Sequence, residues 1–477
     1  MPLKTVFFDM GGTIDTYWYS PEMRIAATPG LQRLLLSHGI DLHLDDLQLY
    51  KHVTDGIACY HQWRLASFDE LTPYQVWRNY ILADDPHDFP QLESVADDLM
   101  VWMETNYYER RMRPEIPAVL DAIQKMGYKI GLISNVNSRG QVPYSLKQYG
   151  IYHYFDPIVL SSEYSRRKPD PSIFHYAARL SNTPTSECVY IGDRISRDIL
   201  GAKRAGYKLA VQIQHDFDHG ESDEGAVPDL IVHDMNEFLE ILRADLEHQD
   251  KGTHIEGMSI NQVRAILFDA DGVLYYRKDK GHELTSFLVS MGIKVDQVPI
   301  SKLQHFRGLA STGQMTFEEY KTSVMHLYGI TDPKLIAQGI KISKDGNHDI
   351  GHFDGVRETL EELKKRNLYL GIVTDTAQPL HVKLGKLERG GIGHVWDTII
   401  SSQEVGVKKP NPKIYQLALQ QLNLQPSQAV FVGHKTTELE GASKVGLKTI
   451  AFNCDPDAKA DYYIEKFSDL ATLSIMN

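Results

Sequence analysis

Short apolar runs that lead into an aspartate recur along this chain of 477 residues. The run KTVFF precedes Asp9, and far downstream the run RAILF precedes Asp269. Both are continuously apolar rather than alternating, which is typical of parallel strands buried on both faces of a sheet. Amphipathic segments such as PAVLDAIQKMG and VRETLEELKKRN separate such runs and predict helices. This alternation favours an α/β fold, with a parallel sheet flanked by helices.

The same four blocks occur twice and in the same order. After the first block, YKIGLISN is repeated as LYLGIVTD, which aligns Ser134 with Thr374. RRKPDPSIFHYAARL is repeated as KKPNPKIYQLALQQL, and CVYIGDRISRDILGAKRAG as AVFVGHKTTELEGASKVG. The copies are separated by about one domain length, which indicates a duplication or fusion of two similar domains rather than a solenoid.

A long insertion separates the first block from the second in each copy, at about residues 17–113 and 275–353. Both insertions show helical periodicity and no strand-like run, and Thr316 is the expected N-cap of a helix in the second. Insertions of this length predict small helical domains. We therefore expect a first domain at 1–246, a polar linker at 247–261 and a second domain at 262–477.

Composition narrows the choice of partners. Lys and Arg number 50 against 63 Asp and Glu, a formal net charge of -13. This balance disfavours nucleic acids and anionic membranes. Three dispersed cysteines form no disulfide framework, and neither a signal peptide nor a membrane-spanning apolar run is apparent. We expect a cytoplasmic protein, in which the acidic stretch HDFDHGESDEG forms a solvated loop.

The strand ends of the first copy carry the residues best suited to chemistry. Proteins with open α/β sheets bind their small-molecule ligands at the carboxyl ends of the strands. Carboxylates that gather at one edge repel one another unless a hard cation such as Mg²⁺ lies among them. A hydroxyl and an ammonium group nearby suit phosphoryl oxygens, and a strand-end carboxylate is then a nucleophile for phosphoryl transfer. The residues concerned are Asp9, Ser134, Lys168, Asp193 and Asp198.

The order DxDG[TV], [ST], KPxP and GDxxxxD resembles the haloacid dehalogenase superfamily in both halves, and the insertions resemble its C1-type caps. The resemblance implies two Rossmann-like cores and Mg²⁺-dependent cleavage of a small phosphomonoester through an aspartyl-phosphate intermediate. It implies catalytic roles for Asp9, Ser134, Lys168, Asp269, Asp271, Thr374 and Lys409. It implies metal ligation by Asp9, Gly11 (through its carbonyl), Asp193 and Asp198, and in the second copy by Asp269, Asp271 and Glu438.

Each copy departs from the family pattern. Gly11 stands where the family has its general acid/base aspartate, and His434 stands where it has a direct metal ligand. A neutral imidazole suits transition metals better than Mg²⁺. Either one copy is a scaffold or each runs a modified reaction. We favour the first copy as the working one, since losing a proton donor usually costs less than losing a metal charge.

Other readings stay open at this point. Phosphomutases share these motifs, and dehalogenases share the aspartate nucleophile, although Asp193 and Asp198 argue against a dehalogenase. A non-catalytic pseudo-phosphatase with a binding or regulatory role is a further alternative.

The aromatic residues after Asp9 either line the substrate entrance or simply pack between core and cap, and Arg166 and Arg167 are expected to form a solvated surface pair. The expected partner is a small phosphorylated metabolite, and the duplication allows the halves to pack as a pseudo-dimer.

Overall fold

The computed structural model describes residues 1–214, 223–252, 263–278, 282–345 and 350–476. It divides into two compact units, Met1–His254 and Ile255–Asn477, each of which is described by itself. Most of the predicted linker at 247–261 lies outside the described residues. Its first part is helical, because α10 runs from Met235 to Gly252.

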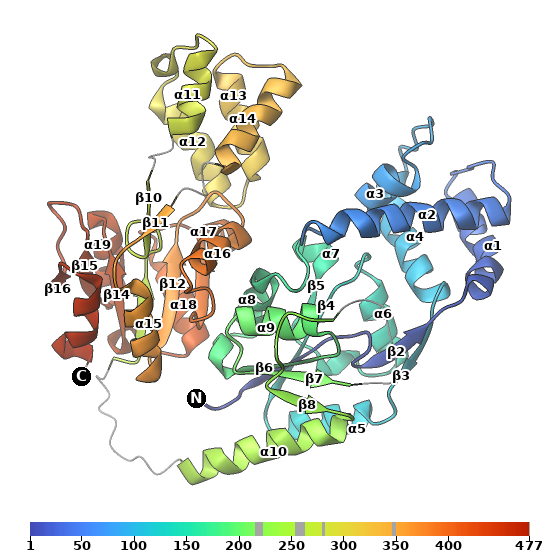
Figure 1. The fold of residues 1–477 in the computed structure, drawn as a ribbon, viewed down its shortest axis with the longest axis horizontal. Coiled ribbons are helices and arrows are strands. Elements are labelled where there is room, and N and C mark those ends of the chain that lie inside the picture. Colours follow the sequence, from blue (N-terminus) through green and yellow to red (C-terminus); the bar gives the residue numbers. More distant parts are fainter. Residues whose placement is uncertain (215–222, 253–262, 279–281, 346–349, 477) are drawn as a thin grey trace. The chain divides into compact units, whose positions relative to one another are not determined.

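A six-stranded parallel sheet forms the core of the first unit, in the order β5-β4-β1-β6-β7-β8 (Figure 1). The strand that leads into Asp9 lies at its centre and is buried along its whole length. The strands are β1 (Thr5–Phe8), β4 (Lys129–Ser134), β5 (Ile158–Leu160), β6 (Cys188–Gly192), β7 (Leu209–Ile213) and β8 (Leu230–Val232).

Side chains alternate across this sheet and pack on helices on both faces. Val6 and Phe8 belong to a core with α5 and α10, whereas Phe7 belongs to a core with α8 and α9. The central strand is therefore covered twice, which explains its uninterrupted apolar sequence. The helices are α5 (Ile116–Lys125), α6 (Gln141–Gln148), α7 (Ser161–Tyr164), α8 (Pro171–Leu180) and α9 (Leu200–Arg204).

The second unit repeats this topology, with a parallel sheet in the order β13-β12-β9-β14-β15-β16. The predicted α/β fold with two such cores is confirmed. The strands are β9 (Ala265–Phe268), β12 (Tyr369–Thr374), β13 (Thr398–Ser401), β14 (Ala429–Gly433), β15 (Lys448–Phe452) and β16 (Tyr462–Ile464). The helices are α15 (Val356–Lys365), α16 (Leu380–Arg389), α17 (Ser402–Val405), α18 (Pro412–Leu422) and α19 (Thr436–Val445).

Each predicted insertion is a helical cap after the first strand (Figure 1). Thr316 caps its helix as expected, since its hydroxyl accepts from the N–H of Glu319. The first cap contains α1 (Pro21–Ser37), α2 (Asp46–Leu65), α3 (Pro73–Val76), a π-helical turn (Trp77–Ile81) and α4 (Leu92–Asn106). The second contains α11 (His282–Ser290), α12 (Ile300–Ser311), α13 (Phe317–Leu327) and α14 (Pro333–Asp345).

The expectation that the insertions contain no strand was wrong. An antiparallel pair, β2 (Asp15–Trp18) with β3 (Glu109–Met112), joins the first cap to its core, and β10 (Tyr275–Arg277) with β11 (Ile350–His352) joins the second. These strands have three or four residues and pair with partners far away in the sequence. A local hydrophobic period cannot reveal such short pairs.

Two local differences separate the copies. After β16, the second unit has a 3-10 helix, Phe467–Thr472, where the first unit has the long helix α10. After β6, a π-helical turn (Ile195–Ile199) precedes α9, whereas α19 begins as a regular helix. Among the described residues, no helix is both long and apolar enough to cross a membrane.

Candidate active site

The carboxyl ends of β1 and β4 and the loop before α8 bring three predicted residues to one small cavity. Asp9, Ser134 and Lys168 line this space of about 100 Å³, together with Gly11 and Arg197. All three predicted side chains are buried. The strand order explains why these side chains lie together, because β1 lies between β4 and β6 and the strands end at the same edge of the sheet.

Lys168 is the centre of the polar network. Its Nζ lies 2.7 Å from Asp9 Oδ1 and 2.6 Å from Asp198 Oδ1. Burial lowers the pKa of Lys168, but Asp198 and Asp9 together raise it above its ordinary value. The lysine therefore stays charged, and it joins Asp9, which follows β1, to Asp198, which lies in the π-helical turn (Ile195–Ile199) after β6.

The carboxylates of Asp9, Asp193 and Asp198 are all buried, and one oxygen of each lies within 4.8 Å of the others. Burial raises the pKa of Asp9 to about 7, the charge of Lys168 opposes this shift, and Asp198 and Asp193 add to it. Three buried acids near one ammonium group thus leave an excess of negative charge. A donor set made only of carboxylate oxygens suits a hard cation such as Mg²⁺.

A glycine permits this close arrangement. Gly12 has φ of 84°, and a Cβ there would lie 2.4 Å from Asp193 Oδ2. In the second unit Gly272 has φ of 88°, and its Cβ would lie 2.8 Å from His434 Nε2. His434 therefore occupies the place that Asp193 has in the first unit.

Two residues of this network were missed from the sequence. Tyr190 on β6 is buried, and its hydroxyl lies 2.8 Å from Lys168 Nζ and 3.0 Å from Asp198 Oδ1. Arg197 lies in the π-helical turn and lines the cavity. Its position between Asp193 and Asp198 was a usable signal, because the first copy has one residue more here than the second. Such π turns often mark functional sites.

Gly11 is neighboured by an aromatic ring. A Cβ at Gly11 would lie 3.0 Å from Tyr17 Cε1, so the ring lies where an acidic side chain would begin. Tyr17 also lines the cavity, and it packs edge to face on Tyr108 from the cap at a centroid distance of 5.8 Å. The aromatic residues after Asp9 thus both line the site and pack against the cap.

A larger cavity of about 620 Å³ extends between the first core and its cap. The expectation of a solvated pair at Arg166 and Arg167 was wrong: Arg167 is 7% exposed and lines this cavity, while Arg166 forms ion pairs with Asp69 and Asp170. Burial and the nearby Arg64 lower the pKa of Arg167 to about 10. The cavity is rich in arginine, contributed by Arg24, Arg64, Arg110, Arg167, Arg194 and Arg197.

Carboxylates are scarce on that lining. Glu104 is the acidic residue among the described side chains that line the cavity, and its two oxygens accept from the N–H groups of Asn137 and Ser138. His61 experiences the same positive field, because burial, Arg64 and Arg167 lower its pKa to about 3. The lining therefore carries more cationic than anionic side chains, although Arg110 and Arg167 have carboxylate partners behind it in Asp15 and Glu70.

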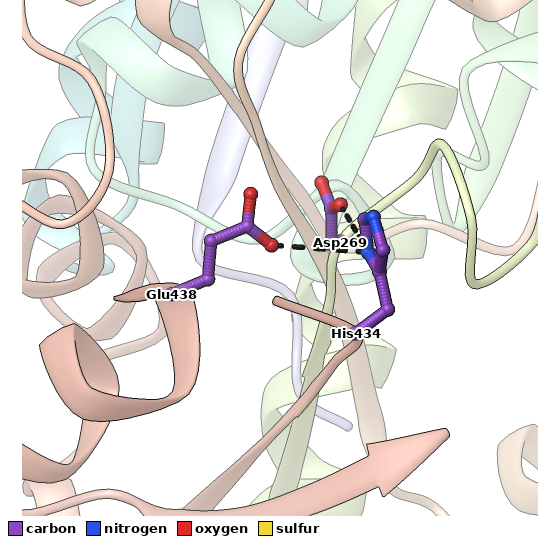
Figure 2. Close-up of side chains that lie close together, drawn as sticks. All are labelled: Asp269, His434 and Glu438. Atoms are coloured by element: carbon purple, nitrogen blue, oxygen red, sulfur yellow. Dashed lines mark ion pairs between the residues drawn. The ribbon is translucent and has the colours of Figure 1, made fainter. Parts of the chain in front are cut away.

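The second unit assembles its residues differently (Figure 2). Lys409 Nζ lies 2.6 Å from Asp269 Oδ1 and 3.2 Å from Glu438 Oε1. His434 Nδ1 lies 3.3 Å from Asp269 Oδ2 and 3.9 Å from Glu438 Oε2. Burial raises the pKa of Asp269, but Lys409 and His434 outweigh it and bring that pKa below its ordinary value. This contrasts with Asp9, whose pKa is raised.

The remaining predicted residues of the second unit are less well placed. The Oγ1 atom of Thr374 is buried and finds no hydrogen-bond partner among the described residues. Asp271 lines a cavity of about 780 Å³, but its carboxylate forms an ion pair with Arg277. Tyr190 of the first network is replaced by Phe431, since both are the third residues of matching strands. The second site therefore lacks one hydroxyl and one carboxylate of the first.

Family models described as haloacid dehalogenase-like hydrolase match the chain twice, over residues 3–206 and 266–452. The chain belongs to the haloacid dehalogenase-like hydrolase family. It contains two domains of this family, each with a helical cap after the first strand. The resemblance proposed from the four sequence blocks is confirmed.

Curated relatives resemble about half of the chain. The glyceraldehyde 3-phosphate phosphatase of Methanopyrus kandleri is 29% identical over 245 residues, which cover 50% of this chain and 97% of that protein. The pyrophosphatase PpaX of Bacillus velezensis is 30% identical over 225 residues, or 45% and 97% of the two chains. The phosphoglycolate phosphatase of Vibrio cholerae is 26% identical over 163 residues, which cover 34% of this chain and 71% of that protein. The extent of these matches is that of single haloacid dehalogenase-like domains.

Proposed function

We propose that the first domain hydrolyses a small phosphomonoester through a phosphoryl group carried on Asp9. The observation that carries this proposal is the position of Lys168, which joins Asp9 to Asp198 inside a buried cluster of carboxylates. The names of the relatives, all phosphatases or pyrophosphatases, support the same reaction class. The domain boundaries at 1–246 and 262–477 remain part of this proposal.

In the first step, a carboxylate oxygen of Asp9 attacks phosphorus while the bond to the substrate alcohol breaks. The substrate oxygen leaves as an alkoxide with the bonding electron pair and takes a proton from solvent. Water then attacks the phosphorus, the bond to Asp9 breaks, and phosphate leaves as the Asp9 carboxylate is restored. Lys168 keeps the Asp9 carboxylate oriented, and the Ser134 hydroxyl lines the cavity where phosphoryl oxygens would lie.

The carboxylate cluster fits a magnesium ion. Asp9, Asp193 and Asp198 would hold it, with the backbone carbonyl of Gly11 as a further ligand. When bound, Mg²⁺ would supply positive charge to phosphoryl oxygens and offset the burial, and the repulsion from Asp198 and Asp193, that together raise the pKa of Asp9. The second unit, with His434 in place of Asp193, does not offer this all-oxygen set.

The arginine-rich cavity indicates which class of substrate the first domain binds. A molecule whose phosphate reaches Asp9 would place its remainder between core and cap, beside Arg64 and Arg167. Two guanidinium groups near each other, one of them 7% exposed, are stabilised by an anion between them. We therefore favour a substrate that carries a second anionic group besides the phosphate that is cleaved.

Trapping the covalent intermediate tests the proposal. The full chain is mixed with an aryl phosphate and Mg²⁺, quenched in acid and digested, and the peptides are analysed by mass spectrometry. A phosphorylated peptide that contains Asp9 is expected, and the Asp9→Asn protein should lack it. Halide release from a 2-haloacid by metal-free protein, without phosphatase activity, would instead support the dehalogenase alternative.

A further inference from the structure

The cavity of the second unit contains two buried lysines that the catalytic motifs do not include. Lys383 is 6% exposed and Lys386 is 2% exposed, and both line the space of about 780 Å³ above Asp269. They are three residues apart on α16 and therefore lie on the same side of that helix. Lysine is rarely buried unless its charge is met by a partner.

Protein partners meet these charges only in part. Lys383 Nζ donates to the hydroxyl of Tyr275 at 2.8 Å, and Lys386 Nζ lies 5.8 Å from the centroid of the same ring. Neither lysine forms an ion pair with a carboxylate among the described residues. Burial lowers the pKa of Lys386 to about 7, the nearby Lys383 and Arg277 add to that shift, and Asp271 opposes it.

Two carboxylates that line the cavity, Asp271 and Glu438, form ion pairs with cations other than Lys383 and Lys386. Asp271 forms an ion pair with Arg277 at 3.3 Å. Glu438 Oε1 lies 3.2 Å from Lys409 Nζ and 3.1 Å from Lys435 Nζ. Asp271 and Asp269 attract Lys383 at a distance, but neither forms an ion pair with Lys383 or Lys386 among the described residues.

The imidazole of His434 also lines this cavity, beside Asp269 (Figure 2). It occupies the place of a metal-binding aspartate and points to Asp269, whose other oxygen is held by Lys409. Asp269 and Glu438 thus face the ammonium groups of Lys409 and Lys435 and a ring nitrogen, and Asp375 beside them accepts from the N–H of Lys409. The ring nitrogen of His434 does not suit Mg²⁺, so this base of the cavity lacks the all-oxygen donor set of the first site.

Two more cations reach the cavity from the cap, Arg307 on α12 and Lys321 on α13. We propose that the second unit binds, without a metal ion and without cleaving it, a small molecule that carries at least two phosphate or carboxylate groups. Lys383 and Lys386 contact one anionic group from the core. Arg307 and Lys321 contact the other from the cap. The cavity volume is that of a typical small-molecule site.

Calorimetric titration tests this proposal on the full chain, with Asp9→Asn to prevent turnover in the first domain, EDTA to remove metals, and inorganic pyrophosphate as the probe. Lys386→Met in this protein should weaken pyrophosphate binding at least tenfold, and Lys383→Met should act in the same direction. Lys413→Met, on the exposed surface of α18, is the matched control and should leave binding as it was.

Thermal unfolding of the unliganded proteins separates a binding role from a structural one. If Lys386 binds a ligand and does not support the fold, Lys386→Met removes a buried charge that has no ion-pair partner among the described residues. The unfolding temperature of the unliganded protein should then rise, while pyrophosphate binding is lost. Unchanged pyrophosphate binding in both lysine variants would overturn the proposal. Binding that appears only after Zn²⁺ or Mn²⁺ is added, and that is lost in His434→Ala, would overturn it in favour of a transition-metal site.

Discussion

Arg277 Nε lies 3.3 Å from Asp271 Oδ2 in the second unit, and the matching positions of the first unit are Tyr17 and Gly11. Both pairs have the same spacing from the strand end and lie where the cap is joined to the core. The second unit thus keeps the carboxylate but neutralises it, while the first has lost it and fills the space with a ring. Neither copy retains an unpaired acid/base carboxylate at this position.

Hydrolysis of the phosphorylated Asp9 should therefore be the slow step in the first domain. The attack of water needs a base, and Gly11 cannot provide one. General acid–base assistance is typically worth about 10² to 10⁴ in rate. Rapid-quench kinetics with an aryl phosphate, whose alcohol leaves readily, should show a burst of product followed by slow turnover.

Gly11→Asp should reduce this burst by speeding turnover, provided that the ring of Tyr17 makes room. The new Cβ would lie 3.0 Å from Tyr17 Cε1, so the double variant with Tyr17→Leu should gain more than Gly11→Asp alone. Tyr17→Leu by itself is the control for the loss of the ring. A wild-type protein without a burst would mean that another group already serves as the base.

The two copies should contribute unequally to phosphatase activity. Asp9→Asn should remove most of kcat, because it deletes the nucleophilic charge while keeping the shape of the side chain. Asp269→Asn should leave kcat for the same aryl phosphate nearly unchanged, since its site lacks the aspartate that His434 replaces. Steady-state assays of the two purified proteins measure this, and the reverse pattern would move catalysis to the second unit.

Magnesium should stabilise the first domain more strongly at high pH than at low pH. The pKa of Asp9 is raised from 3.8 to about 7. The folded state therefore binds the extra proton between these values, and stability is lost as pH rises from about 4 to about 7. Mg²⁺ should offset this loss, so the metal-induced rise in unfolding temperature should be larger at pH 8 than at pH 5.

Asp193→Asn provides the control for that measurement. It removes one proposed ligand but leaves Asp9 and Lys168 in contact, and it should abolish most of the response to Mg²⁺. Phosphatase activity should likewise disappear in EDTA and return with Mg²⁺. Undiminished activity in metal-free protein would contradict the carboxylate cluster as a metal site.

Arg64 should govern affinity for the second anionic group of the substrate. Arg64→Gln should raise KM for 4-carboxyphenyl phosphate about tenfold, as expected for the loss of one charge-assisted hydrogen bond. KM for phenyl phosphate, which has no second anion, should change little. Arg33→Gln, at an exposed position of α1, is the matched control. Equal effects on both substrates would show that Arg64 supports the phosphate or the fold instead.

Much of the fold could be predicted because its causes are local. The apolar runs before Asp9 and Asp269 had to be buried on both faces, and their repetition with Ser134 and Thr374 implied two parallel sheets of the same order. The capped helix after Thr316 followed from a short polar signature. The short strands β2, β3, β10 and β11 were missed because their pairing joins residues far apart in the chain.

The sequence by itself determined the residue types at the strand ends, and through them the family, the duplication and the two departures at Gly11 and His434. Only the tertiary structure decided which charges remain unbalanced. The pKa of Asp9 is raised and that of Asp269 lowered, although both follow the same motif, because the surrounding cations differ in three dimensions. Arg167 was expected on the surface and no motif includes Lys386, yet packing buries both beside cavities. Electrostatic energy depends on distance and burial, which the order of residues does not contain.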